Sequence, residues 1–135
     1  HPPGVRRPMT TPLRLLFVED HDDLREAIGL MLEGDGRSIS AFGTAEEALA
    51  AFERAPFDVL ITDVSLPSMS GTELARRVLE RAPRTWVVLA SGYDLRQGVE
   101  TLGPTARALP KPFEIEQLDA LLEEIATALG QRPSA

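Results

Sequence analysis

The stretch Phe57-Asp58-Val59-Leu60-Ile61-Thr62-Asp63-Val64-Ser65-Leu66-Pro67 decides the fold of this chain. Its apolar centre ends at the carboxylate of Asp63, and such a run predicts a strand that is buried on both faces of a parallel sheet. A second apolar run, Leu13-Arg14-Leu15-Leu16-Phe17-Val18, ends in the acidic pair Glu19-Asp20. Two parallel strands that both end in acids would aim those acids at one crevice. Their mutual repulsion there predicts a hard cation or a proton between them.

The composition of the 135-residue chain predicts one globular domain. Hydrophobic residues make up 43% of the sequence and charged residues 26%, which is ordinary for a globular protein. No run of about 18 apolar residues is present, so we expect no membrane insertion. The absence of cysteine excludes disulfides and thiolate chemistry. The net charge of −7 argues against direct nucleic acid binding, because phosphate recognition requires a basic face.

The two ends of the chain differ from its middle. Residues 1–11 are rich in proline and polar residues and lack the apolar core of a signal peptide. We interpret them as a disordered leader, either a native segment before Met9 or a remnant of recombinant expression. We expect residues 12–130 to form the domain and residues 131–135 to form a disordered tail.

Apolar runs alternate with helical patterns along the domain, which is typical of a parallel sheet covered by helices. The five expected strands are Leu13–Val18, Arg37–Phe42, Val59–Thr62, Trp86–Ala90 and Ala106–Leu109. The predicted fold class is therefore α/β, a doubly wound (βα)5 sandwich of three layers. In such open sheets, ligands bind outside the carboxyl ends of the strands.

Between these strands, apolar residues recur at the 3.6-residue period of a helix. The first expected helix has this stripe at Leu24, Ala27, Ile28 and Met31. A capping box at Thr44-Ala45-Glu46-Glu47 opens the second helix, and Gly130 follows the last one as a C-terminal cap. The fourth helix is the weakest, because Gly98 interrupts it and Gly103-Pro104 closes it.

Polar side chains follow the ends of four of the expected strands. They are Glu19 and Asp20, Asp63, Ser91 and Lys111. The chemistry that this set can perform is phosphoryl transfer to a carboxylate, with Asp63 as the nucleophile that forms an aspartyl phosphate. Magnesium held by Glu19 and Asp20 would offset the repulsion between nucleophile and phosphoryl oxygens. Lys111 would supply a positive charge and Ser91 a hydroxyl donor.

Residues 13–129 resemble the receiver domain of two-component response regulators, the CheY-like superfamily. The resemblance rests on five marker positions, which are Glu19, Asp20, Asp63, Ser91 and Lys111, the last followed by Pro112. Residues 58–71 are similar to the phospho-acceptor motif, with Leu66 where Met is commoner. Residues 109–113 are similar to the end motif, whose Lys–Pro bond is typically cis.

The resemblance implies a flavodoxin-like strand order of 2-1-3-4-5. It implies a cytoplasmic signalling switch rather than an enzyme, which promotes only its own phosphorylation and dephosphorylation. The phosphoryl group would pass to Asp63 from a histidine kinase or a histidine phosphotransfer domain, and an output protein of unknown identity would respond. Residues 90–93 and 110–113 resemble the receivers of hybrid histidine kinases in particular.

The resemblance also implies a role for each marker. Asp20, Asp63 and the backbone carbonyl of Ser65 would ligate Mg²⁺, or Mn²⁺ in its place, and Glu19 would act mostly through a bound water. Ser91 would move toward the phosphoryl group and Lys111 would pair with it.

One position departs from the family pattern. Ala108 stands three residues before the lysine, where the family has Tyr or Phe, whose rotamer changes with phosphorylation. Because alanine has no rotamer to change, our hypothesis is that residues 94–105 are remodelled or mobile and that the signal leaves by another surface. Tyr93 and Ser65 lie at positions that tune the lifetime of the phosphoryl group in the family.

Other interpretations of the same residues stay open. We expect Asp22 and Asp23 to cap the first helix, and His21 to face solvent at its start rather than to bind a metal. A phosphorylation-independent pseudo-receiver that binds partners is one alternative function. A phosphohydrolase that uses an aspartyl phosphate is another, although Ser65 stands where such enzymes have a second acid. Dinucleotide binding is the weakest, because no Gly-x-Gly-x-x-Gly follows the first strand.

Overall fold

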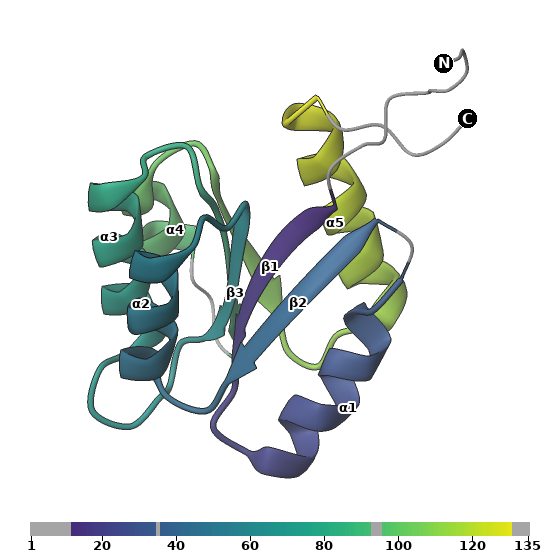
Figure 1. Cartoon of the computed structure of the whole chain (residues 1–135), viewed down its shortest axis with the longest axis horizontal. Helices are drawn as coiled ribbons and strands as arrows, with labels where there is room; N and C mark the ends of the chain where they lie inside the picture. Colours follow the sequence, from purple (N-terminus) through teal and green to yellow (C-terminus); the bar gives the residue numbers. More distant parts are fainter. Residues whose placement is uncertain (1–11, 35, 93–95, 131–135) are drawn as a thin grey trace.

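The computed structural model describes residues 12–34, 36–92 and 96–130. Within these ranges the chain alternates strand and helix from its first strand to its last helix (Figure 1). The leader and the tail expected at residues 1–11 and 131–135 lie outside the described residues, as does Tyr93.

The strands form one parallel sheet at the centre of the described structure. They are β1 (Leu13–Val18), β2 (Arg37–Phe42), β3 (Val59–Asp63), β4 (Trp86–Ser91) and β5 (Ala106–Pro110). Their order is β2-β1-β3-β4-β5, which confirms the predicted fold class and strand order. The apolar runs predicted the bounds of β1 and β2, whereas β3, β4 and β5 each continue one residue further. They do so because the parallel ladder pairs Asp63 with Ala90 and Ser91 with Pro110.

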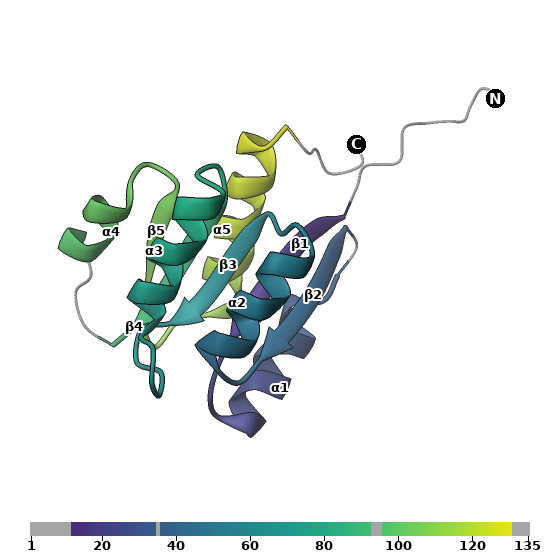
Figure 2. The ribbon, with the colours of Figure 1, turned by 60° about the vertical axis from the view of Figure 1, so that its left-hand side comes forward.

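Helices cover both faces of this sheet. They are α1 (Asp22–Leu32), α2 (Ala45–Arg54), α3 (Gly71–Arg81), α4 (Arg96–Leu102) and α5 (Ile115–Ala128). Helices α1 and α5 lie on one face and α2, α3 and α4 on the other, which gives the three predicted layers (Figures 1 and 2). None of the helices in the described ranges is long and apolar enough to cross a bilayer.

Buried apolar side chains form one cluster on each face of the sheet. On the first face, the helices contribute the large residues Leu32, Leu118, Leu122 and Ile125. On the second face, α2 contributes three alanines and α3 contributes Leu74, Ala75 and Val78. Both strand faces are apolar as well, which explains the continuous Val, Leu and Ile runs in the sequence.

Helix α1 buries less of its apolar stripe than a core helix does. Leu32 is fully buried at its C-terminal end. The large apolar side chains that remain exposed in the described ranges all belong to this helix, and they are Leu24, Leu30 and Met31. The periodicity therefore predicts the helix correctly, but part of its apolar surface is left uncovered.

Two of the predicted helix-end signals are confirmed. The Thr44 side chain accepts a hydrogen bond from the Glu47 backbone N–H at 3.1 Å, which caps α2. Gly130 follows α5 with a φ of 80°, and its N–H donates to the carbonyl of Thr127 at 3.0 Å. A positive φ at this position favours glycine over other residues.

The expected start of α1 was wrong. Asp22 and Asp23 are residues of its first turn, and the N-cap is His21, whose side chain makes no capping hydrogen bond. The His21 backbone stays extended and donates its N–H to the Glu19 carboxylate at 3.1 Å, and the helix begins at Asp22, earlier than a cap at Asp22 or Asp23 would give. The two aspartates still interact favourably with the positive end of the helix dipole.

Candidate functional site

The carboxyl ends of the central strands meet at one edge of the sheet, because all strands are parallel. The register sets Asp63 beside Ala90, and Ser91 beside Pro110. The backbone N–H of Lys111 then donates to the carbonyl of Ser91 at 2.7 Å. Backbone hydrogen bonding thus brings Asp63, Ser91 and Lys111 together, although 48 residues separate the first from the last.

Asp63 and Lys111 form an ion pair across this edge. The Lys111 Nζ lies 3.0 Å from Asp63 Oδ2, and the two side chains are 31% and 14% exposed. The other oxygen, Oδ1, accepts a hydrogen bond from the backbone N–H of Ser65 at 3.3 Å. Low exposure strengthens such a charge pair relative to one in open water. Lys111 is therefore held at the carboxylate rather than free in solvent.

The acidic pair after β1 lies at the same edge. The Glu19 side chain is only 3% exposed, whereas that of Asp20 is 31% exposed. The Glu19 backbone N–H donates to the carbonyl of Phe42 at 3.1 Å, which ties the pair to the end of β2. A buried carboxylate is costly unless a charge or a donor compensates it.

The side chain that pairs with Glu19 is that of His21. The ring Nδ1 of His21 lies 3.1 Å from Glu19 Oε2 and 3.6 Å from Asp20 Oδ1. The hydrogen bond to Glu19 raises the pKa of His21 above 6.5, and the negative charges of Asp20, Glu19 and Asp63 act in the same direction. The ring is 75% exposed, so the expected solvent-facing position is found. Its contact with both acids was missed by the sequence reasoning.

Arg25 is a second residue that sequence reasoning missed. Its Nη1 donates to the backbone carbonyl of Glu19 at 2.8 Å, and its Nη2 donates to Asp22 Oδ1 at 2.6 Å. A Cβ atom at Gly43 would lie 2.9 Å from Nη1, so the guanidinium fills the space beside that glycine. Arg25 therefore holds the backbone of the acidic pair from the first turns of α1.

The donor atoms at this edge fit a hard divalent cation. Glu19, Asp20 and Asp63 supply carboxylate oxygens, which are the ligands that Mg²⁺ prefers. Among the described residues, the exposed ring of His21 is the only ion-pair partner of the buried Glu19 carboxylate. One ligand atom each from Glu19, Asp20 and His21 lie within 4.8 Å of one another. Further positive charge is therefore favourable there.

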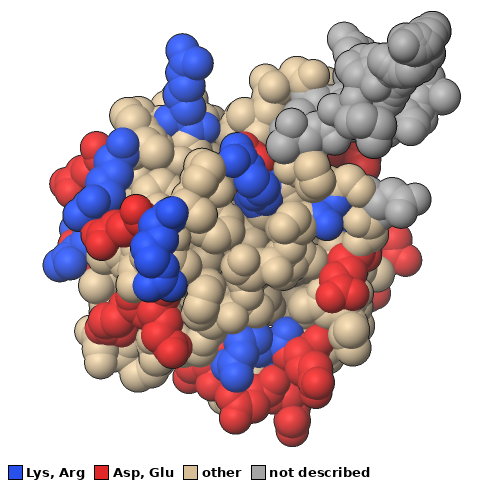
Figure 3. Space-filling view, viewed as in Figure 1, with Lys and Arg blue, Asp and Glu red and all other residues tan. Residues whose placement is uncertain are grey.

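Acidic side chains also gather outside this cluster. In the space-filling view they concentrate along the lower edge of the molecule, where α1 begins and β1 and β2 end (Figure 3). The surface around the site is therefore negative, which favours cations over anions near it.

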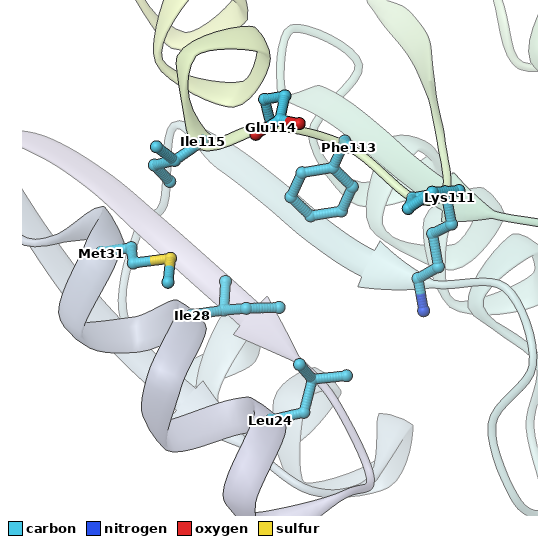
Figure 4. A pocket seen from close by; sticks show the side chains of 8 residues that line it. Leu24, Ile28, Met31, Lys111, Phe113, Glu114 and Ile115 are labelled. Carbon is cyan, nitrogen blue, oxygen red and sulfur yellow. The ribbon is translucent and has the colours of Figure 1, made fainter.

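An apolar groove adjoins the site on its α1 side (Figure 4). It has a volume of about 570 Å³. Leu24, Ile28 and Met31 form one wall, and residues 111–115 form the other. The Lys111 ammonium lies at the end of the groove near Leu24 (Figure 4). The Lys111–Pro112 bond in this wall is cis, as the family resemblance predicted.

Ala108 lies in β5, paired with Leu89, and is partly buried. No aromatic side chain can therefore act at this position. The hypothesis of another signalling surface stays a prediction, as does the lifetime role of Ser65, which is exposed. The corresponding role of Tyr93 concerns a residue outside the described ranges.

Comparisons with known proteins show the family of this chain. A family model for the response regulator receiver domain matches residues 15–123. The chain is 31% identical over 117 residues to the response regulator receiver protein CpdR of Brucella abortus (strain 2308), with 85% of this chain and 98% of CpdR covered. It is 37% identical over 125 residues to the response regulator protein FleR of Pseudomonas aeruginosa, with 90% of this chain and 26% of FleR covered.

The chain is also similar to solved structures. The chemotaxis protein CheY4 of Vibrio cholerae has a TM-score of 0.77 and 28% identity, with 85% of this chain and 99% of CheY4 covered. The chain thus spans almost all of a single-domain relative such as CpdR but about a quarter of FleR.

Proposed function

Because the chain belongs to the response regulator receiver domain family, we propose that it is the phosphoacceptor module of a two-component phosphorelay, with Asp63 as the acceptor. The contact between Asp63 Oδ2 and Lys111 Nζ at 3.0 Å carries this proposal. It joins a partly buried carboxylate to a fixed cation at the carboxyl edge of the sheet. The nucleophile and a positive charge that can pair with the transferred phosphoryl group are thereby adjacent.

The proposed reaction needs only side chains of this edge. A carboxylate oxygen of Asp63 attacks the phosphorus of a phosphohistidine on the donor protein, a P–O bond forms, and the P–N bond breaks with its electron pair returning to the imidazole. Lys111 then shifts its charge from the carboxylate to a phosphoryl oxygen. Ser91, which is buried at the end of β4, donates its hydroxyl to another phosphoryl oxygen. Positioning and electrostatics carry most of such a transfer.

The receiver family generally binds Mg²⁺ at its acidic pocket, and the donor set here fits that ion. In our proposal Asp20, Asp63 and the backbone carbonyl of Ser65 hold Mg²⁺, or Mn²⁺ in its place, and Glu19 acts through a water. The ion supplies charge neutralisation between the acids and the incoming phosphoryl group. Arg25 fixes the backbone from which Glu19 and Asp20 project.

We propose that the phosphoryl donor docks in the apolar groove between α1 and residues 111–115. The groove runs directly from the reactive end of Lys111 along Leu24, Ile28 and Met31 (Figure 4). Leu24 and Met31 are exposed by 40% and 54%, which is unusual for large apolar side chains without a partner. A helix of a histidine kinase or of a histidine phosphotransfer domain, with an apolar face, would cover them.

Receiver domains are signalling switches, and we propose that this one promotes only its own phosphorylation and dephosphorylation. Its output protein and its cytoplasmic location belong to the same proposal. The pseudo-receiver would be expected to have lost marker residues, whereas Asp63 and Lys111 are present here and in contact. The phosphohydrolase is disfavoured because Ser65, two residues after the acceptor, carries no acid.

Intact-mass measurement with a small phosphoryl donor and Mg²⁺ tests the acceptor. Wild type is expected to gain one labile phosphoryl group, whereas Asp63→Asn gains none. Asp23→Asn is the matched control, since Asp23 is an exposed acid of the first turn of α1 that lies outside the cluster. Uptake by Asp63→Asn would contradict the proposal. Failure of wild type to accept from both the small donor and its kinase would favour the pseudo-receiver.

The docking groove is tested by Met31→Glu, which places a charge on its apolar wall. Transfer from a phosphorylated histidine phosphotransfer domain is expected to slow, while uptake from the small donor is unchanged. Leu30→Glu is the control, because Leu30 is also exposed on α1 but does not line the groove. Equal slowing by both substitutions would argue against docking in the groove.

A further inference from the structure

The ring of His21 lies beside the two acids that follow β1. Its Nδ1 is 3.1 Å from Glu19 Oε2 and 3.6 Å from Asp20 Oδ1. Donor atoms that bind one ion at about 2.1 Å lie about 3.0–3.5 Å apart, and the separation of Nδ1 from Asp20 Oδ1 is close to that range, while the hydrogen bond to Glu19 holds the ring there. The ring is 75% exposed, so an ion could reach it from solvent.

Two features of the backbone keep His21 next to Glu19. The His21 N–H donates to the same Glu19 oxygen that the ring contacts, at 3.1 Å. His21 is also the N-cap of α1, with an extended backbone at φ −84° and ψ 119°. Both constraints hold the Cα of His21 close to Glu19, so its ring needs little reorganisation to remain at the pocket.

An imidazole nitrogen changes which ions a pocket prefers. Carboxylates and carbonyls suit Mg²⁺, whereas imidazole suits Zn²⁺, Ni²⁺ and related first-row ions. Oxygen-only pockets therefore favour these ions over Mg²⁺ less strongly than a pocket with an imidazole ligand does. A pocket that adds one nitrogen gains affinity for the transition ions selectively.

We propose that His21 is a specificity-determining ligand, which gives this pocket a nitrogen donor and an enhanced affinity for first-row transition ions over Mg²⁺. The inference rests on the proposed function in one respect only, namely that the acids around Asp20 hold a cation. In the absence of an ion the same ring pairs with Glu19 and offsets its buried charge.

Isothermal titration calorimetry with Ni²⁺ alone and with Mg²⁺ alone, at pH 8, tests this assignment. His1, the other histidine of the sequence, is replaced by Ser in every protein so that it cannot bind Ni²⁺. The variants are His21→Phe, which keeps a ring without a ligand atom, and Asp20→Asn, which removes a carboxylate from the same pocket. Asp23→Asn, outside the cluster, is the control that should bind both ions as wild type does.

His21→Phe is expected to weaken Ni²⁺ binding by about tenfold or more, an effect as large as that of losing a supporting group around a metal. Its Mg²⁺ affinity should change by less than about twofold, because Mg²⁺ keeps its oxygen ligands. Asp20→Asn should weaken the binding of both ions.

Equal changes for the two ions in His21→Phe, or no change for Ni²⁺, would overturn the assignment of His21. Those outcomes leave the proposed function intact as long as Mg²⁺ binding depends on Asp20. If wild type binds no Mg²⁺ at millimolar concentrations, the pocket of the proposed function fails instead. A Ni²⁺ affinity that still depends on His21 would then support the nitrogen ligand by itself.

Discussion

Helices α1 and α2 pack on the same half of the sheet from opposite faces, and they differ in how much of their apolar surface is buried. Helix α2 presents three alanines, Ala45, Ala48 and Ala51, each exposed by 7% or less. Helix α1 buries Leu32 completely but leaves Leu30 65% exposed and Met31 54% exposed. The described residues of α2 thus bury their alanines against the sheet, whereas the α1 side is open beside Lys111.

The contrast shows what an apolar period does and does not determine. The period tells which side chains share one side of a helix. It does not tell whether that side is covered, because coverage depends on how closely the helix approaches the sheet. The small side chains of α2 are buried, whereas the larger ones of α1 line a groove that the described residues leave open. The face covered by α2 and α3 serves stability, and we infer that the open α1 side serves binding.

Gly71→Ala should have the largest effect, because Gly71 belongs to the face covered by α2 and α3 and supports the site. Its Cβ would overlap the carbonyl oxygen of Asp63 and would lie 2.9 Å from that carbonyl carbon. Since backbone must move, we expect a loss of about 4 kcal/mol in the free energy of unfolding. Urea denaturation measures it. Gly98→Ala, with no neighbouring atom within 4 Å, should instead stabilise by about 0.5–1 kcal/mol. Equal effects would contradict this difference in packing.

Leu32→Ala and Leu30→Ala separate the covered and uncovered parts of α1. Leu32 is 0% exposed and belongs to the core cluster beneath α1 and α5, so its truncation should cost about 3 kcal/mol. Leu30 is exposed, and its truncation should change the stability by less than about 0.5 kcal/mol. Thermal or urea unfolding of both variants gives the comparison. A large loss in Leu30→Ala would show that this part of α1 is covered after all.

Sequence reasoning predicted the scaffold well because its signals are local. The apolar runs gave the strands to within one residue, and Thr44 and Gly130 marked helix ends through hydrogen bonds that span a few residues. The strand order came from the family resemblance rather than from the residues. The predicted start of α1 was wrong, because His21, whose N–H is held by the Glu19 carboxylate, is the N-cap in place of Asp22 or Asp23.

The site was predicted as a set of residues but not as a set of contacts. The acids and Lys111 were found because each follows a strand that ends at one edge. The pairing of basic side chains with acids could not be predicted. Lys111 pairs with Asp63 across 48 residues, and the His21 ring contacts Glu19, two residues before it. Arg25 was missed because its partner is a backbone carbonyl, which leaves no trace in the residue pattern.

Arg25→Gln should weaken the connection between α1 and the acidic pair. The charged hydrogen bond to the Glu19 carbonyl is lost, and since the side chain is 25% exposed we expect a cost of about 1 kcal/mol. Mg²⁺ affinity should fall as well, because the backbone of Glu19 and Asp20 becomes freer. Urea unfolding and calorimetric Mg²⁺ titration measure the two effects. Arg54→Gln, on the exposed surface of α2, is the control, and an equal loss there would contradict a specific role for Arg25.

The smallest effect concerns His21 at the exposed start of α1 and depends on pH. Its pKa in the folded protein is raised above 6.5, first by the hydrogen bond to Glu19 and then by the charge of Asp20. The imidazolium therefore stabilises the fold fully below about pH 6.5, the pKa of the unfolded state, and this contribution is lost as pH rises through the folded pKa.

NMR titration of the His21 ring in the presence of EDTA should show the raised pKa, and Glu19→Gln should bring the pKa back toward 6.5. The stability difference between wild type and His21→Asn should be greatest near pH 6 and should disappear at higher pH. If the pKa of His21 is the same in Glu19→Gln as in wild type, the ring does not interact with the Glu19 carboxylate and is only solvated.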